Sequence, residues 1–304
     1  MCSYLLRSRT VKIEKIKFKP DIFEANQLLG VINLESCLYQ DAVLYFSKAL
    51  QLNYSDASCH SNIGYAYCEL GNLEQSEKHH EIALSIQPHN PDFLYNNGLT
   101  KSAQNQLDSA LQFFEAALHI QSNYYRSYDG IGNVLIKKNK LNAAILAFDK
   151  ALEINKTYEK SLNNKSLCLY KLRLIPDAMK CLNKLISINP KNHDAHANLA
   201  ACYSYLKDFR LCLRHYKLSK LLNKSTPLID GAINYAEAAI CDWSQKDNTV
   251  NQLYESLIEG IISTAPFNLL CITDNRNKIR HITEIYSSYY HPTTSEHKFC
   301  LLYT

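Results

Sequence analysis

Small and bulky residues recur along this chain in columns that repeat every 34 residues. Gly30, Gly64, Gly98 and Gly132 occupy one column, which continues with Ser166 and Ala200. A second small column contains Ala42, Ser76, Ala110, Ala144, Ala178 and Cys212, and a bulky column contains Phe46, His80, Phe114, Phe148, Leu182 and Tyr216. Six units follow one another without insertion or deletion from about Phe23 to Thr226, so the pattern indicates an internal repeat.

Within each unit the small and large residues lie three and four positions apart, as the buried face of a helix requires. Small residues let two helix backbones approach, and bulky residues fill the space beside the crossing. Pro88 and Pro190 stand at unit ends, where a helix must stop. Each unit is therefore predicted to be a helix, a tight turn and a second helix. Because no unit can bury its apolar face alone, we expect neighbours to stack into a right-handed, all-α superhelix.

The second unit shows the pattern most clearly, with the runs Asn62-Ile63-Gly64-Tyr65-Ala66-Tyr67 and Gly71-Asn72-Leu73, then Ala83 and Pro88. Over residues 23–226 the chain resembles the tetratricopeptide repeat family. The resemblance implies a curved scaffold that binds peptides and has no chemistry of its own. Two departures are mild, because His80 stands in an aromatic column and Leu185 replaces an alanine in the fifth unit.

Asparagine is enriched at the repeat position that lies two residues before the glycine column. This position holds Leu28, Asn62, Asn96, Gly130, Asn164 and Asn198. This position adjoins the buried ones of the first helix, so we expect it to face the concave side of the superhelix. A carboxamide offers two donors and an acceptor, and one per repeat would hold about every third peptide group of an extended strand. Where the column breaks at Gly130, Asn133 lies one turn away and would replace the amide. The alternative is a set of solvated polar positions in an asparagine-rich chain.

Beyond Ser225 we expect the columns to end and a helical connector to follow. A helix is predicted over Pro227 to Ile240, then Cys241-Asp242-Trp243-Ser244, a helix around Val250 to Ser263, the segment Ala265-Pro266-Phe267-Asn268-Leu269-Leu270 and a third helix to about Tyr290. This order is similar to the O-linked N-acetylglucosamine transferase (SPINDLY-type) family. The resemblance implies that the stretch joins a repeat arm to a two-lobed glycosyltransferase that uses a UDP-sugar. A second interpretation, which is compatible with the first, is that Trp243 caps the end of the array.

The chain departs from that family after the third helix. Fewer than fifteen residues follow Tyr290, whereas each catalytic lobe needs about 150 residues to enclose a core. The family's catalytic histidine and nucleotide-binding lysine would both lie beyond Thr304. We therefore assign no catalytic residue and expect no cofactor in this chain.

Composition excludes several classes of protein. With 46% apolar and 20% charged residues the chain is not disordered throughout, and 8 Gly and 8 Pro are too few for a β-sandwich or a Rossmann array. A net charge of +4 is too small to indicate nucleic-acid binding, and no apolar run is long enough to span a membrane. Residues 1–22 form a basic lead-in without the apolar core of a signal peptide; a transit peptide or a lipid-surface arm is the alternative to a frayed end.

Cysteine and histidine give no sign of a metal site. The eleven cysteines are scattered singly, which indicates reduced thiols and a cytoplasmic protein, and Cys168, Cys202 and Cys212 occupy small apolar positions. His193 and His196 have a spacing that can bind metal on a helix, but no third ligand lies nearby in the sequence. We assign both to a repeat boundary and predict no metal site.

These observations predict three regions: a basic lead-in (1–22), six repeats (23–226) and a helical connector (227–304). We expect a scaffold that binds protein clients as extended peptides, without nucleic acid or membrane, and a homodimer through the repeats is compatible with it. By resemblance, it would be the substrate-recruiting arm of an O-linked N-acetylglucosamine transferase-like protein. The alternatives are part of an active glycosyltransferase whose catalytic portion is truncated or on another chain, and a free-standing adaptor.

Overall fold

The computed structural model describes residues 22–223, 229–241, 255 and 275–290. These residues contain fourteen α-helices and no strand, so the all-α prediction is confirmed. The chain divides into two compact units, residues 1–161 (unit 1) and 162–304 (unit 2). No helix within the described ranges is long and apolar enough to cross a membrane. The basic lead-in, apart from Ile22, lies outside the described residues.

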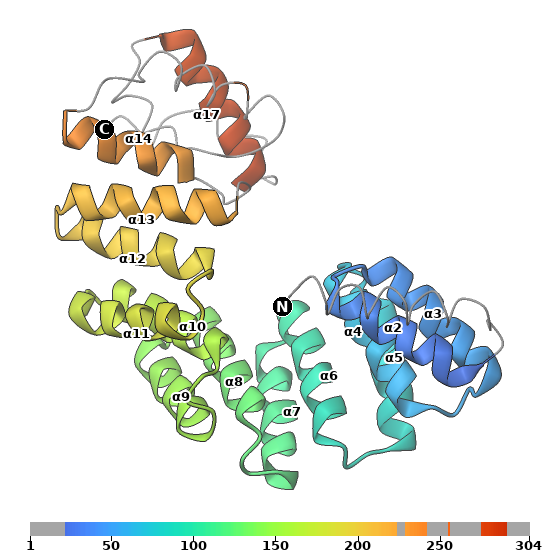
Figure 1. The fold of residues 1–304 in the computed structure, drawn as a ribbon. Coiled ribbons are helices and arrows are strands. Elements are labelled where there is room, and N and C mark those ends of the chain that lie inside the picture. Colours follow the sequence, from blue (N-terminus) through green and yellow to red (C-terminus); the bar gives the residue numbers. More distant parts are fainter. Residues whose placement is uncertain (1–21, 224–228, 242–254, 256–274, 291–304) are drawn as a thin grey trace. The chain divides into compact units, whose positions relative to one another are not determined.

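Unit 1 consists of four helix pairs and the start of a fifth (Figure 1). The pairs are α2 (Phe23–Glu35) with α3 (Tyr39–Leu52), α4 (Ala57–Glu69) with α5 (Leu73–Ile86), α6 (Pro91–Ala103) with α7 (Leu107–Ile120), and α8 (Tyr125–Lys137) with α9 (Leu141–Ile154). Within each pair the two helices run antiparallel and pack along their lengths, and each second helix also contacts the first helix of the next pair. The sequence predicts this arrangement, because each helix packs on its partner in the pair and the pair must also bury its remaining apolar face against the next pair.

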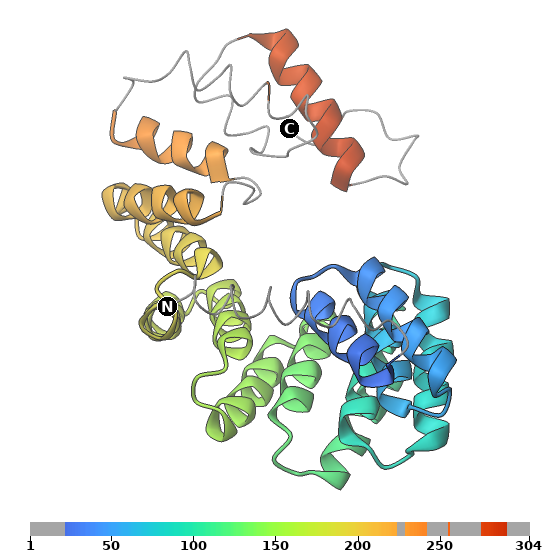
Figure 2. The ribbon, with the colours of Figure 1, turned by 45° about the vertical axis from the view of Figure 1, so that its right-hand side comes forward.

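Unit 2 continues the same arrangement, which Figure 2 shows from another side. It contains the rest of α10 (Glu159–Lys171), then α11 (Ile175–Ile188), α12 (His193–Tyr205), α13 (Phe209–Leu222), α14 (Ile229–Ala239) and α17 (Arg276–Tyr290). All six predicted helix pairs are therefore present.

The glycine column exists because an aromatic ring packs directly on each glycine. Phe46, Phe114 and Phe148 are fully buried on the second helices. A Cβ atom at Gly30 or Gly98 would lie 2.6 Å from the ring of Phe46 or Phe114, and one at Gly132 would lie 2.4 Å from Phe148. Only a residue without a side chain leaves room for the ring. The glycine column in the sequence therefore marks the positions where a ring of the second helix contacts the first helix.

The turn between the two helices of a pair also repeats with the 34-residue step. Its second-last residue has a positive φ in each of the six pairs: Cys37, Gly71, Asn105, Asn139, Arg173 and Lys207. The following N–H bonds to the carbonyl five residues earlier, as from Asn72 to Tyr67 at 2.9 Å. This left-handed residue and its hydrogen bond end the first helix and turn the chain back.

Helix α14 extends the repeat beyond the predicted boundary. It buries Ile229, Ile233 and Ala236, and Ala236 packs with Ala200 and Cys212 of the preceding pair. The positive φ of Cys241 is the seventh in the series of turn residues. Helix α14 and Cys241 thus continue the 34-residue step past Ser225, where we expected the columns to end.

Candidate peptide-binding surface

In unit 1 the first helices of successive pairs form one layer. Helices α2, α4, α6 and α8 contact one another in order, more extensively than the second helices of neighbouring pairs do. A layer whose helices lie closer together is the inner side of a curved stack. The predicted asparagine column stands on these first helices.

Two of the predicted asparagines tie neighbouring first helices together. Asn96 on α6 donates a hydrogen bond from Nδ2 to Oγ of Ser61 on α4, over 3.0 Å. Asn198 on α12 donates from Nδ2 to Oδ1 of Asn163 on α10, over 2.8 Å. Both bonds join a position of one unit to the preceding position of the previous unit, 35 residues away. The asparagine column thus has a structural task that the sequence did not reveal.

The other predicted positions differ from one another. Asn62 on α4 and Asn164 on α10 occupy the same repeat position and are half-buried. Asn133 lies on α8 beside the break, and its Nδ2 donates to the carboxylate of Asp129 on the same helix over 3.1 Å. Gly130 itself is a second steric glycine, since a Cβ there would lie 2.7 Å from the ring of Phe114. The column therefore breaks at that point for a packing reason.

A buried carboxyl group lies beside this break. Asp129 is 3% exposed and accepts hydrogen bonds from Ser161 at 2.7 Å and from Asn133. Burial raises its pKa, while the bonds from Ser161 and Asn133 and the charge of Lys160 oppose that rise. These donors allow a polar group to lie within the inner layer.

Tyrosines gather around the same part of unit 1. The ring of Tyr95 on α6 contacts that of Tyr124 with centroids 5.8 Å apart, and Tyr125 on α8 contacts Tyr158 at 4.8 Å, both edge to face. The hydroxyl of Tyr124 donates to Asp92 at the start of α6. Aromatic rings with polar tips are common in protein interfaces.

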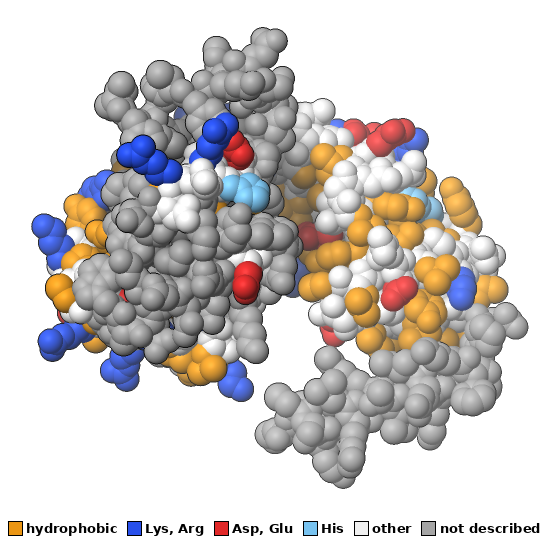
Figure 3. Space-filling view, turned by 90° about the horizontal axis from the view of Figure 1, so that it is seen from above, with side chains coloured by type: hydrophobic (Ala, Val, Ile, Leu, Met, Phe, Trp, Pro, Cys, Tyr) orange, Lys and Arg blue, Asp and Glu red, His pale blue; other side chains and the backbone are white. Residues whose placement is uncertain are grey.

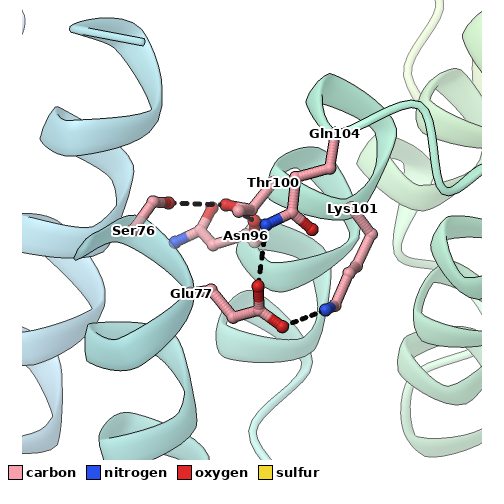
Figure 4. A network of polar contacts seen from close by, with 6 residues as sticks. All are labelled: Ser76, Glu77, Asn96, Thr100, Lys101 and Gln104. Carbon is pink, nitrogen blue, oxygen red and sulfur yellow. Dashed lines mark hydrogen bonds and ion pairs between the residues drawn. The ribbon is translucent and has the colours of Figure 1, made fainter. Parts of the chain in front are cut away.

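A polar network fixes α6, the helix that carries Asn96 (Figure 4). Ser76 on α5 donates to the carbonyl of Gly64 at 2.8 Å, and its hydroxyl also lies 2.7 Å from that of Thr100. Glu77 on α5 accepts from Lys101 of α6 and from Gln104, which directly follows that helix, and these bonds hold the pKa of Glu77 below its usual value. The network locates one inner helix relative to the helix pair before it.

The histidines considered for metal binding have other partners. Nδ1 of His196 lies 3.1 Å from Nδ1 of His215 on α13, and its Nε2 bonds to the carbonyl of Pro190 at 3.1 Å. His193 lies 3.2 Å from the carboxylate of Asp194. No group of three or more potential metal ligands is present in the part of the chain that the structure describes.

The buried cysteines behave as small apolar residues. Cys168, Cys202 and Cys212 are buried as predicted, and no cysteine among the described residues forms a disulfide. Burial raises the pKa of the Cys202 and Cys212 thiols to about 11, so both remain protonated and unreactive at neutral pH.

Most of the predicted connector motif lies outside the described residues, namely Asp242, Trp243, Ser244, Pro266 and Phe267. Cys241 is described; it is exposed and adopts the left-handed turn conformation. In the sequence, Trp243 falls 34 residues after Phe209, in the bulky column that opens each second helix.

Comparison with known proteins places one helix pair in a family. Residues 125–158, which form α8, α9 and the adjoining turn, match the tetratricopeptide repeat. A curated protein of Haemophilus influenzae, described as uncharacterized, is 30% identical over 97 residues, which are 32% of this chain and 54% of that protein. The chain thus spans about half of that relative's length.

Three solved structures share the fold. The Cut9–Hcn1 hetero-tetramer of APC/C matches over 75% of this chain and 45% of its own with a TM-score of 0.65 at 15% identity. A thermophilic tetratricopeptide-repeat protein of Thermus thermophilus matches over 60% of this chain and 100% of its own, with a TM-score of 0.57 at 16% identity. PilF of Pseudomonas aeruginosa matches over 67% and 93%, with a TM-score of 0.55 at 19% identity.

At identities of 15–19% these structures show a shared fold and nothing more. None of the three is named as a glycosyltransferase. The family match covers one 34-residue unit, and the same helix pair and turn recur with a 34-residue step on both sides of it. Residues 125–158 thus match the tetratricopeptide repeat, and the described helix pairs on both sides share the fold of solved structures that contain such repeats.

Proposed function

We propose that the chain is a scaffold for protein–protein interaction and that the inner layer of first helices binds protein segments in an extended conformation. The observation that carries this proposal is the recurrence of half-buried asparagines at one inner position of the repeat. Asn62 and Asn96 stand in unit 1, and Asn164 and Asn198 stand in unit 2.

The hydrogen bonds of Asn96 and Asn198 sharpen the proposed chemistry. In both, one amide N–H is held by the preceding first helix, which fixes the side-chain orientation. A carboxamide has a second N–H and an oxygen with two lone pairs, which match the C=O and N–H of a peptide group. An amide held in place by its neighbour loses little rotamer freedom on binding, so it suits sequence-independent recognition of a backbone.

The spacing of the column fits an extended ligand. Successive helix pairs stack about 10 Å apart, while an extended strand rises about 3.3 Å per residue. Amides one repeat apart therefore meet every third peptide unit. The residues between them are free to contact the tyrosines near Tyr95 and Tyr125, which would select among ligands.

A selection experiment tests this function. A library of random linear peptides is panned against the full chain, and the affinity of a selected peptide is then measured for variants. Replacement of Asn62, Asn96, Asn164 and Asn198 by Ala should weaken binding strongly, while replacement of the exposed Asn142 and Asn183 on the second helices should not. Circular dichroism checks that each variant keeps its helices. A library without binders, or equal affinities for both sets of variants, would refute the proposal.

A second candidate function rests on the connector motif. We infer from Cys241-Asp242-Trp243-Ser244 and Pro266-Phe267 that the scaffold serves as the client-recruiting arm of an O-linked N-acetylglucosamine transferase-like protein in the cytoplasm. An antibody raised against the repeats tests this in the native cell. A band of about twice the chain's mass that contains transferase lobes supports the recruiting arm. A band near 35 kDa favours the free-standing adaptor.

A further inference from the structure

Charge changes sign along the array. Residues 22–115 carry eleven Asp and Glu and three Lys, whereas residues 162–223 carry eleven Lys and Arg and three Asp. The first stretch belongs to unit 1 and the second to unit 2. The small net charge of the whole chain conceals this difference.

The change of sign follows the columns of the second helices. One 34-residue column contains Glu74 on α5 and Asp108 on α7, and then Arg210 on α13. Another contains Glu81, Glu115 and Asp149, and then Lys217. Each column thus carries acidic residues in unit 1 and one basic residue in unit 2, where Pro176 and Asn183 are the other members.

The side chains concerned are exposed. In unit 1, Glu81 on α5 and Glu115 on α7 are exposed, and we call them the acidic face. Glu74 and Asp108 are exposed too but are neutralised in part by Lys78 and Lys138. In unit 2 the basic face consists of Lys180 and Lys184 on α11 with Arg210 and Arg214 on α13, all exposed. Figure 3 shows Lys and Arg side chains projecting at the edge of unit 2.

We propose that the basic face of unit 2 docks on the acidic face of unit 1 in a second copy of this chain. The contact is heterologous, because the two faces differ, and it therefore builds head-to-tail chains. It is formed by exposed ion pairs, so it is weak, reversible and sensitive to salt.

The repeat geometry explains why a second copy fits this surface. Glu81 and Glu115 occupy one column and are one repeat apart. Lys180 and Arg214 also occupy one column and are one repeat apart. The same stacking of helix pairs sets both separations, so the two acidic and the two basic groups have matching spacing. An unrelated acidic protein would need to reproduce that spacing independently.

Sedimentation equilibrium of the full chain tests the proposal over a range of protein concentrations. At about 0.01 M ionic strength the average mass should rise above 34.8 kDa with concentration, and at about 1 M it should return to that of the monomer. A chain that is monomeric at every concentration at low ionic strength overturns the proposal, as does association that salt leaves unchanged.

Charge reversal identifies the two faces. The double variant K180E/R214E and the double variant E81K/E115K should each weaken self-association about tenfold or more. An equimolar mixture of the two should associate again, because each then offers the face that the other lacks. The variant K140E/K156E changes the net charge as much as K180E/R214E does but lies outside both faces, and it should associate like the unmodified chain.

The mixture gives the decisive result. Charge reversal that merely harmed folding would not be repaired by mixing, and circular dichroism of each variant checks its helices. Should a double variant lose them, the pair R214E and E115K takes its place. Failure of the mixture to associate, or equal weakening in K140E/K156E, overturns the docking of one face on the other.

Discussion

Nδ1 of His60 on α4 lies 3.1 Å from Nδ1 of His79 on α5, and the ring centroids are 5.3 Å apart. The centroid separation exceeds the nitrogen separation by about the sum of the two centroid-to-nitrogen distances, so the two Nδ1 atoms point at each other. One proton lies between them in this hydrogen bond. Nε2 of His60 bonds to the carbonyl of Tyr54 at 3.0 Å and must donate, so Nδ1 of His60 accepts from His79. His196 and His215 repeat the geometry at 3.1 Å and 5.3 Å.

Acid should destabilise both pairs. Burial, and then the neighbouring His60, lower the pKa of His79 to about 4. The unfolded chain, with an ordinary histidine pKa of about 6.5, then binds more protons than the folded chain between these two values. The contribution of His79 to the free energy of unfolding should be fully present above about pH 6.5. It should fall by up to about 3 kcal/mol as the pH falls toward 4. Urea unfolding at a series of pH values measures it.

The variant His79→Gln should show a smaller loss over that pH range, because its side chain does not titrate. The exposed His89 provides the control, and its replacement by Gln should leave the pH profile unchanged. Equal profiles for all three proteins would show that the pair does not govern acid stability.

Replacement of His80 by Phe should stabilise the protein. It is fully buried in the column of Phe46, Phe114 and Phe148, and neither ring nitrogen has a hydrogen-bond partner. Burial, and then His79, lower its pKa to about 4. Removal of two unsatisfied buried atoms should raise the free energy of unfolding by about 1–3 kcal/mol at neutral pH.

The gain from His80→Phe should grow as the pH falls from about 6.5 toward 4, because the original histidine costs more there. The reverse exchange, Phe114→His, should destabilise the protein by a similar amount. Chemical unfolding of both variants measures the two changes, and a neutral effect of either would contradict this account of the column.

Gly98→Ala should destabilise the protein, although alanine favours helices. The added Cβ would lie 2.6 Å from the Phe114 ring, so the ring or the helix must shift at a cost of about 1–3 kcal/mol. This exceeds the helix-propensity gain of about 1 kcal/mol.

The double variant Gly98→Ala/Phe114→Leu should cost less than the sum of its single changes. The fifth unit already combines the larger Ser166 with the slimmer Leu182 at these positions. Thermal unfolding of the single and double variants gives the coupling, and strict additivity would argue against ring contact as the reason for glycine.

Lys207→Gly should stabilise the protein by about 1 kcal/mol. Lys207 has a φ of +61° in the turn before α13, where an L side chain crowds its own backbone. The equivalent turn after α4 uses Gly71 at +77°. As a contrast, Lys184→Gly inside α11 should lose about 1 kcal/mol. The denaturant concentrations at the unfolding midpoints of both variants measure these changes. A lower midpoint in both variants would show that the turn at Lys207 is not strained.

The sequence by itself determined the helix pairs, their number up to the sixth unit and the identity of the packed columns. It did so because a fixed step, combined with small and bulky residues three and four positions apart, leaves one way to bury the apolar faces. It also predicted that the asparagine column stands on the first helices. The columns were assigned from the sequence only as far as Ser225, although Ala236 falls in the column of Ala66 and Cys241 falls in that of Cys37.

Only the tertiary structure decided which polar groups meet. His60 and His79 are 19 residues apart on two helices, and Asn96 and Ser61 are 35 apart. A periodic pattern records which face of a helix is buried, because burial depends on the position of a residue around its own helix. A hydrogen bond depends on the distance and direction between two particular atoms on different helices, which are fixed only when the helices have packed.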